Sequence, residues 1–171
     1  VYRQPGSSFK VLTAFAPAID TCGATLSTVY YDAPYTVGQK TFRNWYAKKG
    51  YMGYSTIRDG IVYSMNIVAV RCMMETVTPQ LGVEYARNFG ITSLTETDYN
   101  AATALGGITK GVSNLELTGA YAAIANGGIY TKPVFFTKIL DHNGKVLLEN
   151  EPQTKRVLKD STAFLLTDAL A

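Results

Sequence analysis

The sequence has few of the side chains that most hydrolytic and metal-dependent enzymes use. It contains one histidine in 171 residues, His142, and two cysteines, Cys22 and Cys72. His142 stands in an Asp-His-Asn-Gly stretch that is typical of a turn. A Ser-His-Asp triad, a Cys-His dyad and a zinc site therefore all lack residues that they need. We expect no metal ion and no cofactor. Because the only histidine stands in a turn, any nucleophilic chemistry must use another base.

Other absences exclude further classes. No run approaches the roughly 18–20 apolar residues of a membrane span, and no signal peptide is visible. The net charge is only +3 and adjacent basic residues are few, as at Lys48-Lys49, so no nucleic-acid partner is expected. Gly106 and Gly111 have the spacing of a phosphate-binding loop, but Val112 stands where the lysine is required, which indicates a glycine-rich turn.

The two cysteines and the carboxylates give no clear indication of catalysis. Cys22 and Cys72 could pair, although two buried free thiols are favoured because a lone pair makes no disulfide framework. Asp32, Asp59 and Glu75 form no recognisable catalytic pair and are interpreted as solvated surface charges. The composition is that of one globular domain, with 47% apolar, 17% charged and 12% aromatic residues.

The first half of the chain predicts helices on both sides of an irregular stretch. One helix is expected from Ser7 to about Asp20. Residues 23–54 lack a clean hydrophobic period and are interpreted as a long loop. Its aromatic residues could line a cleft, but packing of the loop against the surface is favoured. These residues are Tyr30, Tyr31, Tyr35, Phe42, Trp45 and Tyr46.

A second helical pattern begins at Thr56, a plausible N-cap, with Ile57, Ile61 and Val62 on one face. The pattern breaks near residues 64–66 and resumes in an apolar run over residues 67–74. Two helices joined in this way would hold Ser64 on a short, rigid corner. Thr78-Pro79 starts another helix, which Gly90 ends.

The second half combines a helix, a hairpin and a last helix. Residues 113–116 read as a capping box, followed by a helix that ends at residues 126–128. A turn is expected at residues 141–144 between the runs 134–140 and 146–149, because Asn143-Gly144 between β-prone runs is a hairpin signature. A final helix is expected from Asp160 to the last residue, Ala171.

Ser7 and Lys10 form a candidate nucleophile and base. Residues three apart share a helix face, so Ser7 can meet Lys10, whereas Ser8, two residues away, cannot. A lysine activates a serine only if its pKa falls from about 10.4 toward neutrality. Burial and the positive end of the helix both favour that fall. A helix-capping serine followed by a solvated lysine is the ordinary alternative for this motif taken alone.

Ser64 and Asn66 supply the groups that such a mechanism still needs. A serine on a rigid corner can pass a proton to a leaving amine, and an amide two residues later can hold both a lysine and a substrate amide. Ser-x-x-Lys followed by Ser-x-Asn 57 residues later is the motif pair of penicillin-binding proteins and serine β-lactamases.

The residues around these motifs carry a more specific resemblance. Five segments, in order over essentially the whole chain, resemble the transpeptidase domain of bifunctional, class A penicillin-binding proteins: 3–10, 64–71, 104–107, 111–116 and 121–133. The resemblance implies that Ser7 attacks a D-Ala-D-Ala stem peptide of peptidoglycan or a β-lactam, that Lys10 takes its proton, and that Ser64 relays a proton. It implies that Asn66 holds the substrate and Lys10.

The chain also departs from the family pattern. The third family motif, Lys-Thr-Gly or Lys-Ser-Gly, is absent, because Thr109-Lys110-Gly111 has another order and Thr131-Lys132-Pro133 lacks the glycine. We therefore expect an incomplete transpeptidase domain over residues 1–171. Its expected fold is mainly α with a small antiparallel hairpin, the helical part of the family's α/β fold without most of the central sheet. Residues 1–128 would form the helical part, and residues 129–171 the hairpin and a truncated helix.

The resemblance leads to further expectations. The chain alone should be weak or inactive, and apolar helix faces that once covered the sheet should favour self-association. The parent protein is expected at the outer face of the bacterial cell membrane. A D,D-carboxypeptidase or serine β-lactamase is the alternative within the superfamily. A non-catalytic helical module that binds cell-wall peptide or a partner subunit is the alternative from another class.

Overall fold

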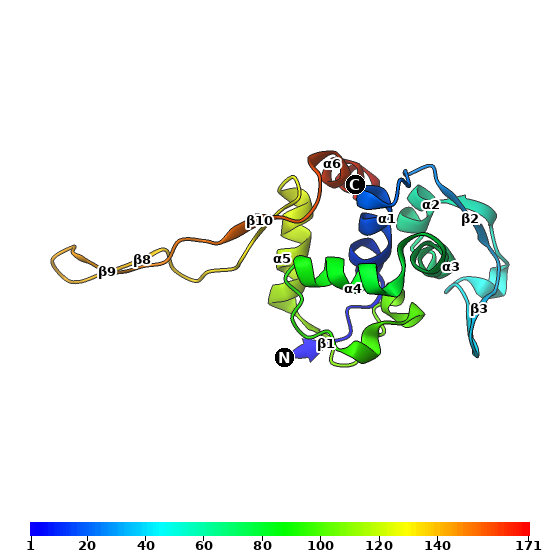
Figure 1. Ribbon diagram of the computed structural model, residues 1–171, viewed down its shortest axis with the longest axis horizontal. Coiled ribbons are helices and arrows are strands. Elements are labelled where there is room, and N and C mark those ends of the chain that lie inside the picture. Colours follow the sequence, from blue (N-terminus) through cyan, green and yellow to red (C-terminus); the bar gives the residue numbers. More distant parts are fainter.

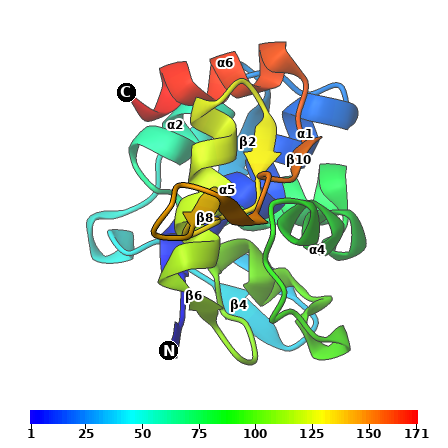
Figure 2. The ribbon, with the colours of Figure 1, turned by 90° about the vertical axis from the view of Figure 1, so that its left-hand side faces the viewer.

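The computed structural model describes all 171 residues as a helical body from which one long β-hairpin projects (Figure 1). The body is seen along the arm in Figure 2, where α6 lies across one end. Its helices are the 3₁₀-helices η1 (Gly6–Ser8), η3 (Ala47–Lys49), η5 (Glu96–Asp98) and η6 (Ala101–Leu105), the π-helices η2 (Val11–Phe15) and η4 (Cys72–Val77), and the α-helices α1 (Ala16–Thr21), α2 (Ile57–Val62), α3 (Asn66–Arg71), α4 (Pro79–Asn88), α5 (Asn114–Ala125) and α6 (Asp160–Leu170).

The strands form five separate antiparallel pairs and no central sheet. The pairs are β1 (Tyr2–Arg3) with β6 (Val112–Ser113), β2 (Val29–Asp32) with β5 (Gly53–Thr56), β3 (Tyr35–Val37) with β4 (Lys40–Phe42), β7 (Ile129–Thr131) with β10 (Thr154–Arg156), and β8 (Lys138–Leu140) with β9 (Val146–Glu149). The expected hairpin is therefore confirmed, and so is the lack of a central sheet. The strands are nevertheless more numerous than the sequence predicted.

A continuous helical segment from Gly6 to Thr21 runs through the middle of the body (Figure 1). Phe9, Leu12 and Phe15 are completely buried there, and η4, α3, α4 and α6 pack around the segment. The predicted helix over Ser7–Asp20 is confirmed, but its middle is a π-helix. Pro17 lacks the N–H of a regular helix, which accounts for the altered hydrogen bonding of the turn before it.

The predicted helix starts are confirmed by their caps. Thr56 and Asp59 form a capping box at α2, and Ser113 and Glu116 form one at α5. The Thr78 hydroxyl accepts a hydrogen bond from the N–H of Leu81 at the start of α4. These interactions lie within four residues of sequence, which is why they could be read from it.

The stretch over residues 23–54 corrects the predicted long loop, because it contains β2, β3 and β4 and the start of β5. In β2 exposed and buried residues alternate, so that Tyr30 and Asp32 point inward. Asp32 is therefore not the solvated charge that was expected: it is 1% exposed and accepts three hydrogen bonds. A buried carboxylate is tolerated when donors surround it.

Three smaller expectations were also wrong. Val62 is 60% exposed and does not share the buried face of Ile57. Residues 134–137 are not a strand, so β8 begins only at Lys138. Asp59 and Glu75 are not simply solvated, because Asp59 belongs to the α2 capping box and Glu75 pairs with Arg71.

Cys22 and Cys72 are both free thiols, of which Cys72 is buried and Cys22 half-buried.

None of the helices combines the length and the hydrophobicity that crossing a bilayer would need.

Candidate active site

The buried amine of Lys10 lies at the corner between α2 and α3. Lys10 is 2% exposed, and its Nζ donates a hydrogen bond to the carbonyl oxygen of Ser64 at 2.6 Å and contacts Ser64 Oγ at 3.0 Å. Residues 54 positions apart in sequence are thus joined as the motif pair suggested. The two contacts fix the direction in which the Lys10 amine points.

Burial lowers the pKa of Lys10 from 10.5 to about 8. No acidic side chain pairs with the amine, so desolvation of the ammonium acts without a compensating charge. At pH 7 about a tenth of the molecules then hold a neutral amine. A neutral amine is what a lysine needs in order to act as a general base.

Ser64 sits in a strained backbone conformation. Its φ is +50°, in the left-handed region that few residues other than glycine adopt. Met65, which is completely buried, follows it, and the Met65 N–H bonds to the carbonyl of Gly60. Such strain costs about 1–2 kcal/mol and persists only where the surroundings fix it. The predicted corner is therefore present, and it presents the Ser64 hydroxyl toward Lys10.

The two serines before Lys10 differ in their freedom to react. Ser8 Oγ donates to the carbonyl of Pro5 at 2.8 Å, and the Ser8 carbonyl accepts from the buried hydroxyl of Tyr121 at 2.7 Å. Ser7 is exposed, and its hydroxyl makes no hydrogen bond to the protein. The direct Ser7–Lys10 contact that the spacing allows is thus not formed in this structure. Hydrogen bonds of catalytic groups are often long before substrate binds.

The glycine-rich turn, residues 106–111, holds the start of the helical segment Gly6–Thr21 in place. A Cβ added to Gly106, whose φ is +72°, would lie 2.4 Å from the carbonyl oxygen of Gly6. Beside this contact the Gln4 amide accepts from and donates to the backbone of Ile108. The turn predicted from the glycines is confirmed, and it packs closely against the backbone of Gly6, through Gly106, and of Arg3, through Gly111.

Asn66, the first residue of α3, only partly meets expectation. Its Nδ2 donates to the carbonyl of Arg43 at 2.9 Å, so the expected contact with Lys10 is not made. Its Oδ1 accepts no hydrogen bond from the protein. The amide is half-buried beside Ser64, and the free oxygen remains an acceptor for a ligand N–H.

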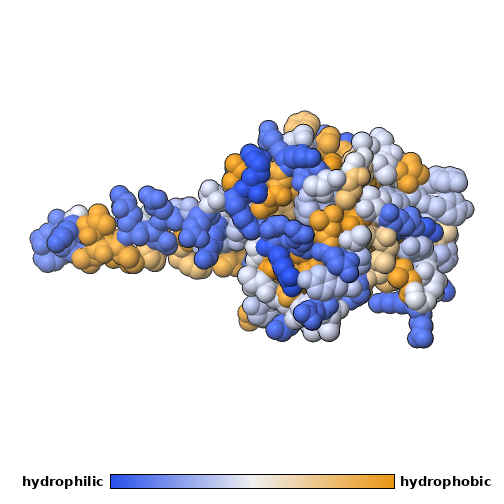
Figure 3. Space-filling view, in the orientation of Figure 1, coloured by the Kyte–Doolittle hydropathy of each residue, from blue (hydrophilic) through white to orange (hydrophobic).

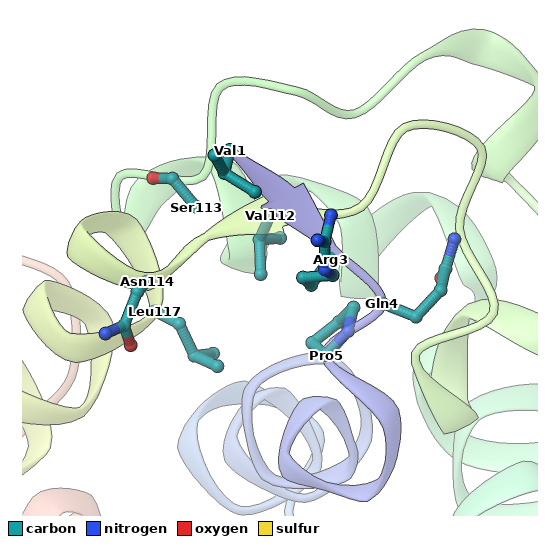
Figure 4. A pocket seen from close by; sticks show the side chains of 8 residues that line it. All are labelled: Val1, Arg3, Gln4, Pro5, Val112, Ser113, Asn114 and Leu117. Atoms are coloured by element: carbon teal, nitrogen blue, oxygen red, sulfur yellow. The ribbon is translucent and has the colours of Figure 1, made fainter.

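Two hollows flank these residues. One of about 340 Å³ lies between β1, Pro5 and the start of α5, and none of the four predicted site residues lines it (Figure 4). The other, of about 270 Å³, is mostly aromatic and reaches Tyr63, the residue before Ser64; Trp45, Tyr46, Lys49, Gly50, Tyr51 and Met52 complete its lining.

Residues of the predicted loop therefore lie against the site, which sequence reasoning missed. Trp45, 72% exposed, donates its indole N–H to the carbonyl of Tyr63 at 3.1 Å. The alternative that these aromatic residues line a cleft holds for Trp45 and Tyr46, while Tyr30 and Phe42 pack inside. No group of three or more His, Cys, Asp or Glu side chains gathers where it could hold a metal ion.

Comparison with known protein families shows which family the chain belongs to. Residues 2–171 match the family model of the penicillin-binding protein transpeptidase domain. The chain belongs to this transpeptidase family. Among curated relatives it is 35% identical to penicillin-binding protein 1A of Clostridium tetani, covering 99% of this chain and 23% of that protein, and 34% identical to penicillin-binding protein 1F of Bacillus subtilis, covering 98% and 23%.

Solved structures of penicillin-binding proteins share the fold. Penicillin-binding protein 1A from Haemophilus influenzae superposes with a TM-score of 0.82 at 28% identity, over 99% of this chain and 29% of that one. The PonA1 protein from Mycobacterium tuberculosis in complex with penicillin V gives 0.84 at 26% identity, over 99% and 46%. The chain thus spans less than a quarter of the length of these curated relatives and has the fold of part of a penicillin-binding transpeptidase domain.

Proposed function

We propose that this chain carries the nucleophile half of a serine-type D,D-transpeptidase that cross-links stem peptides of peptidoglycan and reacts covalently with β-lactams. The observation that carries the proposal is the buried Lys10 amine, with its pKa lowered to about 8, hydrogen-bonded to Ser64. That the relatives are penicillin-binding proteins, one of them solved with penicillin V, supports the choice of ligand.

In the proposed reaction Ser7 Oγ attacks the carbonyl carbon of the penultimate D-alanine, and neutral Lys10 accepts the Ser7 proton. The tetrahedral intermediate collapses to an acyl-enzyme as the C–N bond breaks, and Ser64 passes a proton from Lys10 to the departing D-alanine. The amine of a second stem peptide then attacks the ester carbonyl, and its proton passes through Lys10 to Ser7 Oγ as the ester C–O bond breaks and the cross-linking amide forms. The Ser7 N–H would be one donor of the oxyanion hole.

Ser7 is preferred to Ser8 because its hydroxyl is free and exposed, whereas Ser8 Oγ is bound to Pro5. Asn66 would accept from the backbone N–H of the substrate through its free Oδ1. Since Ser7 and Lys10 are not in contact here, we propose that substrate binding brings Ser7 Oγ toward the amine.

The 171 residues alone should react slowly. They contain no Lys-Thr-Gly or Lys-Ser-Gly, the motif that completes the site in the family, and the loss of one oxyanion donor typically lowers a rate by 10²–10³-fold. We also propose that the chain self-associates through exposed apolar residues such as Phe164 on α6, which is 71% exposed, and that the whole protein works at the outer face of the bacterial cell membrane.

Two alternatives keep the same first step. A D,D-carboxypeptidase or a serine β-lactamase would also form the Ser7 acyl-enzyme, but water would resolve it. Rapid turnover of the β-lactam would indicate a β-lactamase, whereas a long-lived adduct favours the transpeptidase or the carboxypeptidase. A module that only binds cell-wall peptide would form no adduct.

Intact-protein mass spectrometry with penicillin tests the proposal. The complete gene product should gain the mass of one penicillin, located on the peptide that contains Ser7, and the 171-residue chain should do so at least about 100-fold more slowly. Ser7→Ala should abolish the adduct, and the matched variant Ser8→Ala should keep it. An adduct that survives in Ser7→Ala would refute the assignment.

A further inference from the structure

The Ser64 corner is tied by hydrogen bonds to a segment 20 residues earlier in the chain, Arg43–Tyr46. The Asn66 amide donates to the Arg43 carbonyl, and the Trp45 indole donates to the Tyr63 carbonyl. A third bond joins the N–H of Ile67 to Asn44 Oδ1 at 3.1 Å. The residues before and after Ser64 are therefore held by the same short segment, through Arg43, Asn44 and Trp45.

Asn44 is the buried centre of this connection. It is 5% exposed, and all the groups of its amide are used. Its Oδ1 accepts from Ile67, while its Nδ2 donates to Asp32 Oδ1 and to the Tyr46 hydroxyl. The Ile67 N–H is one of the groups that a helix start leaves unpaired, so Asn44 acts as a cap supplied from another part of the chain.

Asp32 fixes the orientation of the Asn44 amide. It stands at the end of β2 and also accepts from the Tyr46 hydroxyl at 3.0 Å and from the N–H of Met52 at 2.9 Å. A carboxylate has only acceptors, so the amide nitrogen of Asn44 must face Asp32 and its oxygen must face Ile67. Burial first, and then the hydrogen bond to Asp32, raise the pKa of the Tyr46 phenol, which keeps it a donor.

We propose that Asn44, oriented by Asp32, is a positioning residue for acylation that sets the place of Ser64 and Asn66 relative to Lys10. The proposal rests on the proposed function of Ser7 and Lys10. The left-handed conformation of Ser64 needs contacts on both sides to persist, and α3 begins only two residues after it. Without the cap, the first turn of α3 and the Ser64 hydroxyl would shift, and a displacement of about 1 Å can cost roughly 10²-fold in rate.

The test compares acylation by penicillin in variants of the complete gene product. Asn44→Ala should lower the first-order acylation rate constant about 10²-fold, a larger effect than on the dissociation constant of the preceding non-covalent complex, to which Asn66 contributes one hydrogen bond. Trp45 is the only tryptophan of this chain. In the 171-residue chain its fluorescence anisotropy should fall in Asn44→Ala, because the segment that Asn44 holds becomes free to move.

A rescue separates positioning from general damage. Asn44→Asp alone would place a carboxylate against that of Asp32 and should react at least as slowly as Asn44→Ala. Adding Asp32→Asn exchanges the two groups and restores the amide–carboxylate pair, so the double variant should recover most of the rate. The control Tyr85→Phe removes a buried hydrogen bond to Asp20 on α1 and should leave the acylation rate unchanged.

Three results would overturn the inference. The first is acylation of Asn44→Ala at the wild-type rate. The second is a double variant, Asn44→Asp with Asp32→Asn, that reacts no faster than Asn44→Asp. This second comparison decides the question if Asn44→Ala does not fold. An equal slowing in Tyr85→Phe would show that any loss of stability slows the reaction. The absence of a Ser7 adduct in the wild type would refute the proposed function, and this inference would fall with it.

Discussion

The helical body and the projecting arm formed by β8 and β9 contrast in how they are held together. In the body the charged or polar groups of Lys10, Asp32 and Asn44 are buried and bonded to residues distant in sequence. In the arm every residue of the two strands is exposed, and its apolar side chains lie along one edge (Figure 3). The arm is held only by its own residues, including the Lys138–Glu149 ion pair and the turn at Asp141.

The contrast explains which residues are sensitive to substitution. Segments of the body that are distant in sequence pack against one another, so a substitution at such a contact disturbs both segments. The arm is held by its own residues, so it can bend or fray without disturbing Lys10. Changes in the body should therefore lower stability, and those at Lys10, Ser64 or Asn44 should lower the acylation rate as well. Changes in the arm should affect neither by much.

The largest difference should come from two glycines with similar backbone angles. Gly106, with φ +72°, lies against the backbone of Gly6, while Gly144, with φ +82°, has no atom within 4 Å of an added Cβ. Gly106→Ala should lower the free energy of unfolding by roughly 2–4 kcal/mol, since strain and a backbone clash add. Gly144→Ala should lower it by about 1 kcal/mol or less. Urea denaturation measures both, and equal losses would contradict the contrast.

A smaller effect should appear in the pH dependence of stability. Because the pKa of Lys10 is about 8 when folded and 10.5 when unfolded, the unfolded chain binds more protons between these values. Stability should therefore rise by roughly 2 kcal/mol from pH 7.5 to 10 relative to Lys10→Met, which lacks the amine. Buried tyrosines such as Tyr121, whose pKa burial raises to about 12, lower stability only above about pH 10. Parallel urea curves for the two proteins over this range would argue against a desolvated amine.

The smallest effects compare two acidic contacts. Glu116 in the body accepts from Thr92 and Ser113, each through backbone and side chain. Glu116→Gln should lower the free energy of unfolding by about 1–2 kcal/mol, because a charged acceptor of several hydrogen bonds is lost. Lys138→Ala in the arm removes an exposed ion pair and should change it by less than about 0.5 kcal/mol. Thermal unfolding followed by circular dichroism should separate the two, and a larger loss in Lys138→Ala would be inconsistent with an independent arm.

Short-range features could be predicted from the sequence because their determinants are neighbours in the chain. The capping boxes at Thr56 and Ser113, the Thr78-Pro79 start and the Asn143-Gly144 turn each involve residues within about four positions. Ser7, Lys10, Ser64 and Asn66 could be proposed as site residues because two short motifs carry them. The structure then brought Lys10 and Ser64 together across 54 residues.

The remaining features depend on partners far apart in sequence. The β2–β5 ribbon has only weak alternation, and its strands pair across about 20 residues of intervening chain. Asp32 looked like a surface charge because its donors, Asn44, Tyr46 and Met52, follow 12 to 20 residues later. The π-helix before Pro17 and the missing Ser7–Lys10 contact depend on backbone detail that side-chain patterns do not encode.

The titration of Lys10 itself is the most direct test of the proposed chemistry. Protein labelled with ¹³C at lysine Cε would be followed by NMR from pH 6 to 11, with Lys10→Arg used to assign the signal. One lysine should titrate with a pKa of about 8, and its signal should be absent in Lys10→Arg. A Lys10 signal that titrates near 10.5 would contradict a buried amine ready to take the proton of Ser7.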